Sequence, residues 1–502
     1  MATPQDDALS SPSHPLGPLT LSGELLQALD RTTQETYLAD SRPWVVGYSG
    51  GKDSTAVVQH TWHALSALPR ETLTKPVYVI SSDTLVESPV IVEQIRTTLQ
   101  RIETAAAEQG LPFKTDIVKP DVRDTFWVNL IGKGYPAPYK RFRWCTDRMK
   151  IQPANRFIKA TAEKFGEVVL VLGVRRSESA ARAQVMSLHK RHGQALSRHS
   201  DMPAAWVYTP IEDWTTNDVW TYLLQVASPW GNNNRDLVAM YKNANAGECP
   251  LVVDTKTPSC GNSRFGCWVC TVVERDRTME AMIENGEDWM LPMLEFRDFL
   301  VTTQDPAQKR GIRDVRRRDG RVHLWGDNKE KVIWGPYKFA FRQELLGRLL
   351  RAQGSVQESG PDADMELITM AELEEIRRIW RMECADWEDT LPKIWEREVG
   401  QPYAWMQDDS AMATAEEAEL LRSIAEQHDV DAKMLSDLID LEKRNSGLHR
   451  RAAIYSEIDS ILKRDWRTEE EVLGRLEEQA IARAAEEEEA LARAAENEPI
   501  GD

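Results

Sequence analysis

The sequence predicts an α/β protein built on a parallel sheet with flanking helices, and two observations support this fold class. Between about residues 40 and 225, short apolar runs alternate with stretches of helical periodicity. The runs are WVVGYS (44–49), VYVISS (77–82), FKTDIVK (113–119) and VVLVLG (168–173), each bounded by Gly, Pro or Asp. Strands that alternate with helices form a parallel sheet, which binds ligands at the carboxyl ends of its strands.

The stretches between these strands predict helices over 54–68, 89–109 and 153–165. Pro89 and Pro153 suit the first turn of a helix, because its N–H groups have no partner within the helix. Thr215 or Thr216 is expected to cap a further helix. An amphipathic helix is expected over 335–353.

Composition divides the chain of 502 residues into several parts, since this length exceeds one ordinary core. Residues 1–25 are polar and rich in Pro and Ser, which predicts a disordered leader. The α/β domain should span 26–230. A loop-rich insert that holds a cysteine cluster and a basic helical cap follows over 231–353. After a linker at 354–364, residues 365–502 should be mostly helical.

Charge and hydropathy exclude several classes of protein. The formal net charge of −18 argues against nonspecific coating of nucleic acid but leaves room for local basic segments. No run of 18 apolar residues occurs and no secretory signal is seen, so we expect no membrane association and a cytoplasmic location. Six cysteines are too few for a disulfide framework.

A glycine-rich turn follows the first predicted strand and opens the first helix. Its residues are Ser49, Gly50, Gly51, Lys52, Asp53, Ser54 and Thr55. The two glycines allow the backbone to approach a phosphate closely, and the helix N-terminus offers N–H groups to an anion. Lys52 adds a cation, and the hydroxyl groups can donate to phosphate oxygens. We therefore expect a binding site for the phosphates of ATP.

This turn is not a Walker A loop, which has four residues between its glycines and then Gly-Lys-Ser/Thr. In this chain Lys52 is followed by Asp53. The turn instead resembles the PP-loop of the adenine nucleotide α-hydrolase superfamily, whose pattern is SGGxDS. That resemblance implies cleavage of ATP between the α- and β-phosphates and an adenylated intermediate. The alternative interpretation is an ordinary strand-to-helix turn.

Four further segments resemble the PAPS-reductase-like branch of that superfamily. They are SSDT (81–84), RFRWCTDRMKIQP (141–153), LGVRRSESAAR (172–182) and TPIEDWTTNDVW (209–220). The resemblance places Asp83 and Thr84 near the nucleotide and makes Arg175 part of the ATP site. Several arginines beside such a site suit a second, phosphate-bearing substrate. Arg176 and Arg182 could equally form surface ion pairs.

Four cysteines fall within a short segment that is rich in Gly, Asn and Pro. They are Cys249, Cys260, Cys267 and Cys270, and the last two form a Cys-x-x-Cys pair. Such a set can ligate zinc or an iron–sulfur cluster, and spacing alone does not separate the two. The PAPS-reductase-like resemblance favours a [4Fe–4S] cluster, with zinc as the alternative.

Cys145 stands apart from this cluster, between basic residues. Arg143, Arg148 and Lys150 would favour its thiolate if they converge on it. Cys145 could carry a persulfide, act as a nucleophile, replace one of the four cluster ligands, or be a small buried residue.

The sequence departs from the sulfonucleotide reductases at its cysteines. No cysteine follows Cys384, so the C-terminal Glu-Cys-Gly motif of those enzymes is missing. The tandem Cys-Cys of APS reductases is missing too, since Cys145 stands alone. A reductive mechanism of that type therefore lacks its nucleophile.

Across its length the chain resembles the DndC family of DNA phosphorothioation sulfurtransferases. The resemblance implies that a DNA backbone phosphate is adenylated by ATP and that sulfur then displaces AMP. Lys52, Asp53 and Arg175 would be catalytic, with a Mg²⁺ ion contacted by Asp53 or Asp83. The implied partners are DNA, a cysteine desulfurase as sulfur donor, and other subunits of a phosphorothioation complex.

DNA would have to bind to a minority of this acidic chain. Residues 309–321 and 140–150 are the basic candidates, although solvated basic loops are an alternative interpretation. Two rival functions also remain. One is an RNA-thiolating or sulfonucleotide-reducing enzyme that uses the same ATP site. The other is a metal-cluster module that binds DNA or partners and holds ATP only as a structural ligand.

Overall fold

The computed structural model describes residues 22–178, 184, 195–244, 266–326, 328, 330–403, 415–445 and 452–496. The chain divides into two compact units. The first comprises residues 1–120, 144–267 and 276–282, and the second comprises residues 121–143, 268–275 and 283–502.

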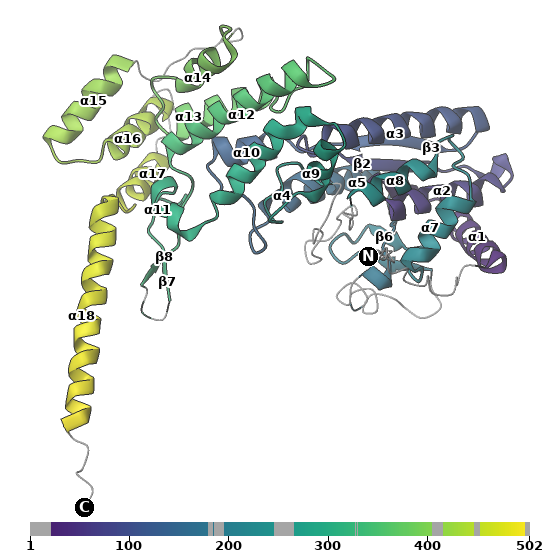
Figure 1. Ribbon diagram of the computed structural model, residues 1–502, viewed down its shortest axis with the longest axis horizontal. Helices are drawn as coiled ribbons and strands as arrows, with labels where there is room; N and C mark the ends of the chain where they lie inside the picture. Colours follow the sequence, from purple (N-terminus) through teal and green to yellow (C-terminus); the bar gives the residue numbers. More distant parts are fainter. Residues whose placement is uncertain are drawn as a thin grey trace, which may run out of the picture. The chain divides into compact units, whose positions relative to one another are not determined.

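The first unit is built on a six-stranded sheet with the order β3-β2-β1-β4-β6-β5 (Figure 1). Its strands are β1 (Trp44–Gly47), β2 (Val77–Ser82), β3 (Phe113–Val118), β4 (Val168–Val171), β5 (Leu196–Arg198) and β6 (Ala205–Tyr208). All neighbouring pairs are parallel except β5 with β6. The four predicted strands are therefore confirmed, whereas β5 and β6 were not predicted. The chain passes from β1 to β2 on one side and returns to β4 on the other, which makes a topological switch point between β1 and β4.

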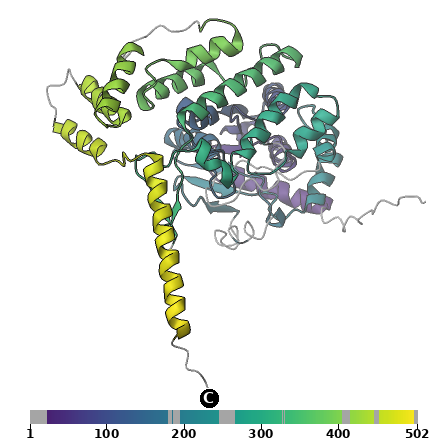
Figure 2. The ribbon, with the colours of Figure 1, turned by 60° about the vertical axis from the view of Figure 1, so that its left-hand side comes forward.

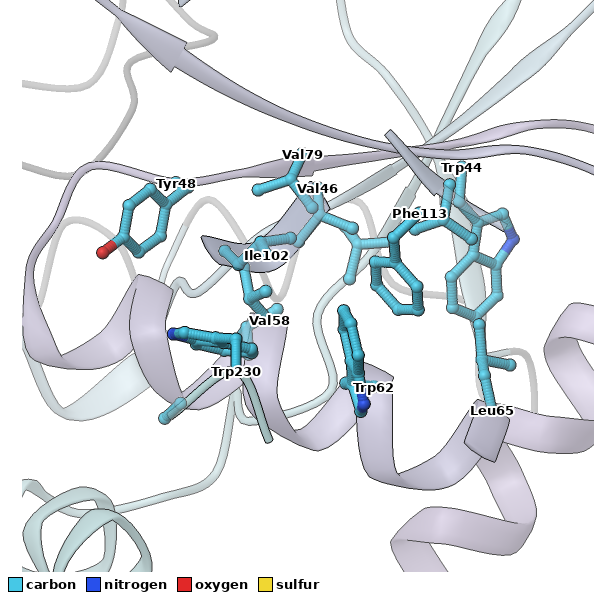
Figure 3. Close-up of a cluster of buried hydrophobic side chains, with 14 of the residues drawn as sticks. Trp44, Val46, Tyr48, Val58, Trp62, Leu65, Val79, Ile102, Phe113 and Trp230 are labelled. Atoms are coloured by element: carbon cyan, nitrogen blue, oxygen red, sulfur yellow. The ribbon is translucent and has the colours of Figure 1, made fainter. Parts of the chain in front are cut away.

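Helices cover both faces of this sheet. They are α1 (Gly23–Leu38), α2 (Lys52–Ser66), α3 (Pro89–Gln109), α5 (Gln152–Phe165), α7 (Thr216–Gln225) and α8 (Asn234–Ala244). On one face α2 and α3 bury Trp62 and Ile102 against the strands (Figure 3). On the other face α5 contributes Ile158. The Trp62 ring packs on Phe113 of β3, with 4.7 Å between ring centroids.

Local sequence signals set the ends of these helices. Helix α3 spans the predicted 89–109, and Pro89 lies in its first turn. Thr215 caps α7 through a capping box with Asp218, in which each side chain accepts from the other residue's backbone N–H. Of the expected leader, residues 1–21 lie outside the described part. Ser22 caps α1, so that helix begins earlier than the domain boundary we expected.

The second unit is mostly helical, as predicted (Figure 1, Figure 2). Its main helices are α10 (Leu291–Thr302), α12 (Phe339–Ser359), α13 (Met370–Glu383), α14 (Thr390–Val399), α15 (Ala415–Gln427), α16 (Ala432–Asn445), α17 (Ala452–Leu462) and α18 (Glu469–Glu496). The expected linker at 354–364 is wrong in its first half, because α12 continues to Ser359 and buries Val356. Among the described helices, none has the length and apolar character needed to cross a bilayer.

Candidate functional site

The glycine-rich turn lies at the switch point of the sheet, directly after β1. Gly50 has φ +74°, and a Cβ there would lie 3.0 Å from the Ile95 side chain. Gly51 is the N-cap of α2 and supplies no side-chain acceptor to the first turn of that helix. Both features fit a phosphate group, because the backbone can approach it closely and the helix N-terminus faces it.

The hydroxyl groups of the turn form hydrogen bonds within the turn itself. The Ser49 N–H donates to Ser54 Oγ over 3.2 Å, and Ser54 Oγ donates to the Gly51 carbonyl over 2.9 Å. Thr55 Oγ1 donates to the same carbonyl over 2.8 Å. In this state Ser54 and Thr55 therefore shape the loop. Their expected donation to phosphate stays a prediction.

Lys52, Asp53 and Arg175 form a buried row of charges beneath the turn. Lys52 Nζ lies 3.1 Å from Asp53 Oδ2, and Arg175 Nε donates to Asp53 Oδ1. The three residues are only 6, 5 and 2 % exposed. Burial, together with the nearby Arg175 charge, lowers the pKa of Lys52 to about 7. Arg175 Nε also lies 3.9 Å from Glu178 Oε1, so two basic groups and two carboxylates meet here. An anionic ligand beside Lys52 would favour the charged form of its amine.

Arg175 is positioned by residues that the sequence analysis did not single out. Its Nη1 donates to Ser177 Oγ over 2.9 Å and to Thr216 Oγ1 over 3.3 Å. Gly173, between β4 and Arg175, lies against the start of α2. A Cβ at Gly173 would be 3.0 Å from the Asp53 carbonyl oxygen. The loop after β4 can therefore approach the loop after β1 only because residue 173 is glycine.

Tyr241 of α8 covers the N-terminal end of α2. Its hydroxyl accepts the Lys52 N–H over 3.2 Å, and its ring centroid lies 5.5 Å from Lys52 Nζ. Trp220 packs edge-on against the Tyr241 ring, with 5.0 Å between centroids. Sequence reasoning missed this residue, since a single tyrosine in a polar helix carries no motif.

Asp83 lies at the carboxyl end of β2, on the same edge of the sheet. Its Oδ1 accepts the Leu85 N–H over 2.9 Å, and its Oδ2 lies 3.5 Å from Arg96 and 3.7 Å from Lys119. Arg176 instead pairs with Asp213 over 3.2 Å, as the surface-pair alternative predicted. Ser179 and Arg182 lie outside the described residues.

Cys267 is partly buried beside polar residues that follow β2. Thr84 Oγ1 lies 3.4 Å from its Sγ, and Glu87 Oε1 lies 3.7 Å away. Lys150 pairs with Glu87 over 3.2 Å. Burial raises the pKa of the Cys267 thiol, and Glu87 and Cys145 raise it further. Thr84, which we expected near the nucleotide, thus contacts a cysteine, and Cys145 is electrostatically coupled to Cys267.

Cys270 lies in a backbone segment that Arg297 of α10 holds in place. The Arg297 guanidinium is fully buried and donates to the carbonyls of Cys270 (3.0 Å), Glu274 (2.7 Å) and Val273. Cys249 and Cys260 lie outside the described residues, and within the described ranges no group of three His, Cys, Asp or Glu residues is arranged to hold a metal. The predicted four-cysteine ligand set therefore stays a prediction.

Two segments of the chain match known protein families. Residues 43–273 match the family model of the phosphoadenosine phosphosulfate reductase domain. Residues 416–463 match the family described as a small protein found in certain Dnd DNA modification systems. The chain therefore carries a phosphoadenosine phosphosulfate reductase-like domain, which supports an enzyme that uses a nucleotide in sulfur-related chemistry.

A curated relative and several solved structures resemble parts of the chain. An uncharacterized protein of Methanocaldococcus jannaschii, MJ0066, is 26 % identical over 242 residues, which are 48 % of this chain and 38 % of that protein. The phosphoadenylyl-sulfate reductase of Candida auris has 18 % identity and a TM-score of 0.26, and the match covers 42 % of this chain and 89 % of that one. The U34-tRNA thiolase NcsA of Methanococcus maripaludis, solved with its [4Fe–4S] cluster, has 10 % identity and a TM-score of 0.27, over 55 % and 80 % of the two chains.

Proposed function

We propose that this protein is an ATP-dependent sulfurtransferase that adenylates a DNA backbone phosphate and replaces one of its oxygens with sulfur. The buried row of Lys52, Asp53 and Arg175 beneath the glycine turn carries this proposal. It brings two hydrogen-bond-donating basic groups to the switch point of an α/β sheet, where a nucleotide would place its phosphates.

In the first step, a DNA phosphate oxygen attacks the α-phosphorus of ATP. The bond between the α-phosphorus and the bridging oxygen breaks, and pyrophosphate leaves with the electron pair. Lys52 and Arg175 neutralise the charge that develops, and the N–H groups at the start of α2 hold the leaving phosphates. In the second step, a hydrosulfide equivalent attacks the activated DNA phosphorus, and AMP leaves. No net oxidation or reduction occurs in either step.

Bound metals would support this chemistry. Mg²⁺ commonly binds one or two carboxylates together with substrate phosphates, so Asp53 or Asp83 would contact it, and it would neutralise phosphate charge. A [4Fe–4S] cluster would be held by Cys249, Cys260, Cys267 and Cys270, and would serve as a structural clip or as a sulfur-handling centre.

The DNA substrate and the partners rest on a separate observation. The match of residues 416–463 to a family from Dnd DNA modification systems supports a DNA modification complex. The sulfur would come from a cysteine desulfurase as a persulfide, as the resemblance to DndC enzymes implies. A second thiol would attack the inner sulfur, form a disulfide and release the outer sulfur as the hydrosulfide equivalent. A protein with net charge −18 suits recruitment to DNA with the help of partners.

Release of pyrophosphate from ATP in the presence of DNA tests the proposal. We expect DNA to stimulate release in the wild-type protein and Lys52→Ala to reduce it by about 100-fold or more. Lys159→Ala, at an exposed position of α5, is the matched control and should retain the wild-type rate. Stimulation by RNA but not by DNA would contradict the DNA substrate, and release by Lys52→Ala at the wild-type rate would contradict the site.

Mass spectrometry of nucleosides tests the product directly. DNA from cells that express the wild-type protein with its partners should contain phosphorothioate linkages, and DNA from cells with Lys52→Ala should not. Phosphorothioate at the wild-type level in the variant would overturn the assignment.

A further inference from the structure

The most basic part of this acidic chain folds into a small β-structure in the second unit. Residues 309–338 contain ten Lys and Arg but four Asp and Glu, a net charge of +6 in a chain with net charge −18. Positions 327 and 329 in this segment lie outside the described residues. The segment contains β7 (Leu324–Trp325) and β8 (Lys331–Val332), which form an antiparallel hairpin (Figure 1). We name residues 309–338 the basic wing.

The basic wing is a folded structure rather than a solvated loop. The backbones of Arg316 and Val322 form a β-bridge across a turn that contains Gly320. A second β-bridge joins Arg313 and Tyr337. Gly335 lies so close to Arg316 that a Cβ at 335 would be 1.6 Å from the Arg316 carbonyl oxygen. The Arg313 side chain donates to the carbonyls of Trp334 and Gly335. These contacts fix the backbone from which the other side chains project.

The cations of the basic wing fall into two groups. Arg313 and Arg316 stabilise the protein, since Arg316 donates to the Arg467 carbonyl over 3.1 Å and lies 3.7 Å from Asp431. Arg321 and Lys331 are exposed. The Lys331 side chain is 60 % exposed, and its Nζ lies 4.0 Å from Glu330 Oε1 in an exposed ion pair that a phosphate could replace. Part of the charge of the candidate segment 309–321 is therefore used within the protein, and its contact with DNA stays a prediction.

Trp325 of the hairpin is exposed in a way that folding does not explain. It is 56 % exposed, and no other tryptophan in the described ranges ranks among the exposed large apolar residues. Lys331 Nζ lies 5.1 Å from its ring centroid, so the ring and the cation form one surface. A tryptophan beside a cation on paired strands has the chemistry to stack on a base and to neutralise phosphates.

We infer that the basic wing is the DNA-contacting element of the second unit, with Arg321 and Lys331 on backbone phosphates and Trp325 on a base. This inference rests on the proposed function, since it takes DNA as the substrate. It adds the surface that contacts DNA, and it divides the affinity for DNA into a phosphate contribution and a stacking contribution. The phosphate contacts depend on salt, whereas the stacking contact does not.

Fluorescence anisotropy tests this inference, with the full chain, a labelled DNA duplex that carries a single-stranded overhang whose bases can stack, and salt varied between about 50 and 200 mM. Arg321→Ala with Lys331→Ala should make the slope of log K against log salt shallower by about 2. Trp325→Ala should weaken binding by about 5- to 150-fold at every salt concentration and leave the slope unchanged. Trp325→Phe should restore most of the loss, which separates stacking from misfolding.

Matched variants at other exposed positions provide the controls. Lys393 and Arg397 of α14 are 62 % and 64 % exposed, so Lys393→Ala with Arg397→Ala removes the same charge elsewhere. Tyr455→Ala removes an aromatic ring that is 75 % exposed. If the wild-type chain binds DNA and the wing variants bind like these controls, the inference is wrong. If the wild-type chain binds no DNA, or prefers an RNA of the same sequence, the proposed DNA substrate is wrong. The inference is then wrong too, because it depends on that substrate.

Discussion

The hydroxyl of Tyr241 occupies a position that a bound phosphate would need. It accepts the Lys52 N–H, which lies at the start of α2, over 3.2 Å. A phosphate oxygen that takes this N–H must first displace the hydroxyl group. Tyr241→Phe removes this acceptor and keeps the ring that packs on Trp220. We therefore expect the variant to bind inorganic pyrophosphate and ATP more tightly than the wild-type protein.

The size of the effect follows from the single hydrogen bond that is lost. A typical hydrogen bond contributes about 0.5–1.5 kcal/mol, which corresponds to about 2- to 13-fold in affinity. The gain should appear with pyrophosphate as well as with ATP, because the competition concerns a phosphate oxygen and not the adenine base. Isothermal titration calorimetry with both ligands measures it.

Tyr208→Phe is the matched control for this measurement. Tyr208 is a buried tyrosine of the same unit, and its hydroxyl bonds to Thr33 over 2.7 Å at a position remote in sequence from the glycine turn. Its removal should leave pyrophosphate affinity unchanged. If Tyr241→Phe weakened pyrophosphate binding, the hydroxyl would be a phosphate donor rather than a competitor, and this reasoning would be refuted.

Three further predictions concern the same unit. Burial and the Arg175 charge lower the pKa of Lys52 to about 7, so at about pH 8 the amine is mostly neutral without ligand. Pyrophosphate binding should then take up protons as Lys52 becomes charged, which calorimetry in buffers of different ionisation enthalpy measures. Binding without proton uptake would show that Lys52 is already charged. Gly173→Ala should destabilise the protein by about 1–3 kcal/mol in a denaturant titration, because the added Cβ meets the Asp53 carbonyl; an unchanged midpoint would contradict the close approach. Thr215→Ala removes the cap of α7 and should cost about 1 kcal/mol, or about 2–4 °C in melting temperature, whereas Thr215→Ser should retain most of it.

Much of the sheet could be predicted because its central strands are buried on both faces. Such strands give continuous apolar runs, as in β1 and β4, and prolines or glycines mark their ends. Strand β5, at the edge of the sheet, carries no such run, and its neighbour β6 offers only the four residues AWVY. Ser197 and Arg198 in β5 are polar. Trp206 of β6 indicates packing, but a tryptophan does not distinguish a strand from a helix. The pairing of β6 with β4 joins residues distant in sequence, whereas β5 pairs with β6 across the short segment 199–204.

The glycine turn was predictable because its function constrains neighbouring residues in the chain. Lys52 and Asp53 belong to one motif, and Arg175 belongs to another motif of known order. Tyr241, Gly173 and the Glu87 beside Cys267 reach their positions only through the fold. No local spacing identifies such residues, so they require the three-dimensional structure.

The buried guanidinium of Arg297 has a consequence for how the Cys270 segment behaves without metal. Three backbone carbonyls of residues 270–274 are fixed by one side chain of α10, and Gln304 adds a bond to the Thr271 carbonyl over 2.9 Å. Small zinc modules, by contrast, acquire their shape only when the ion arrives. Here the backbone is preorganised, so little ordering entropy opposes metal capture at Cys270. A metal that binds Cys270 as proposed would therefore meet a backbone that is already in place.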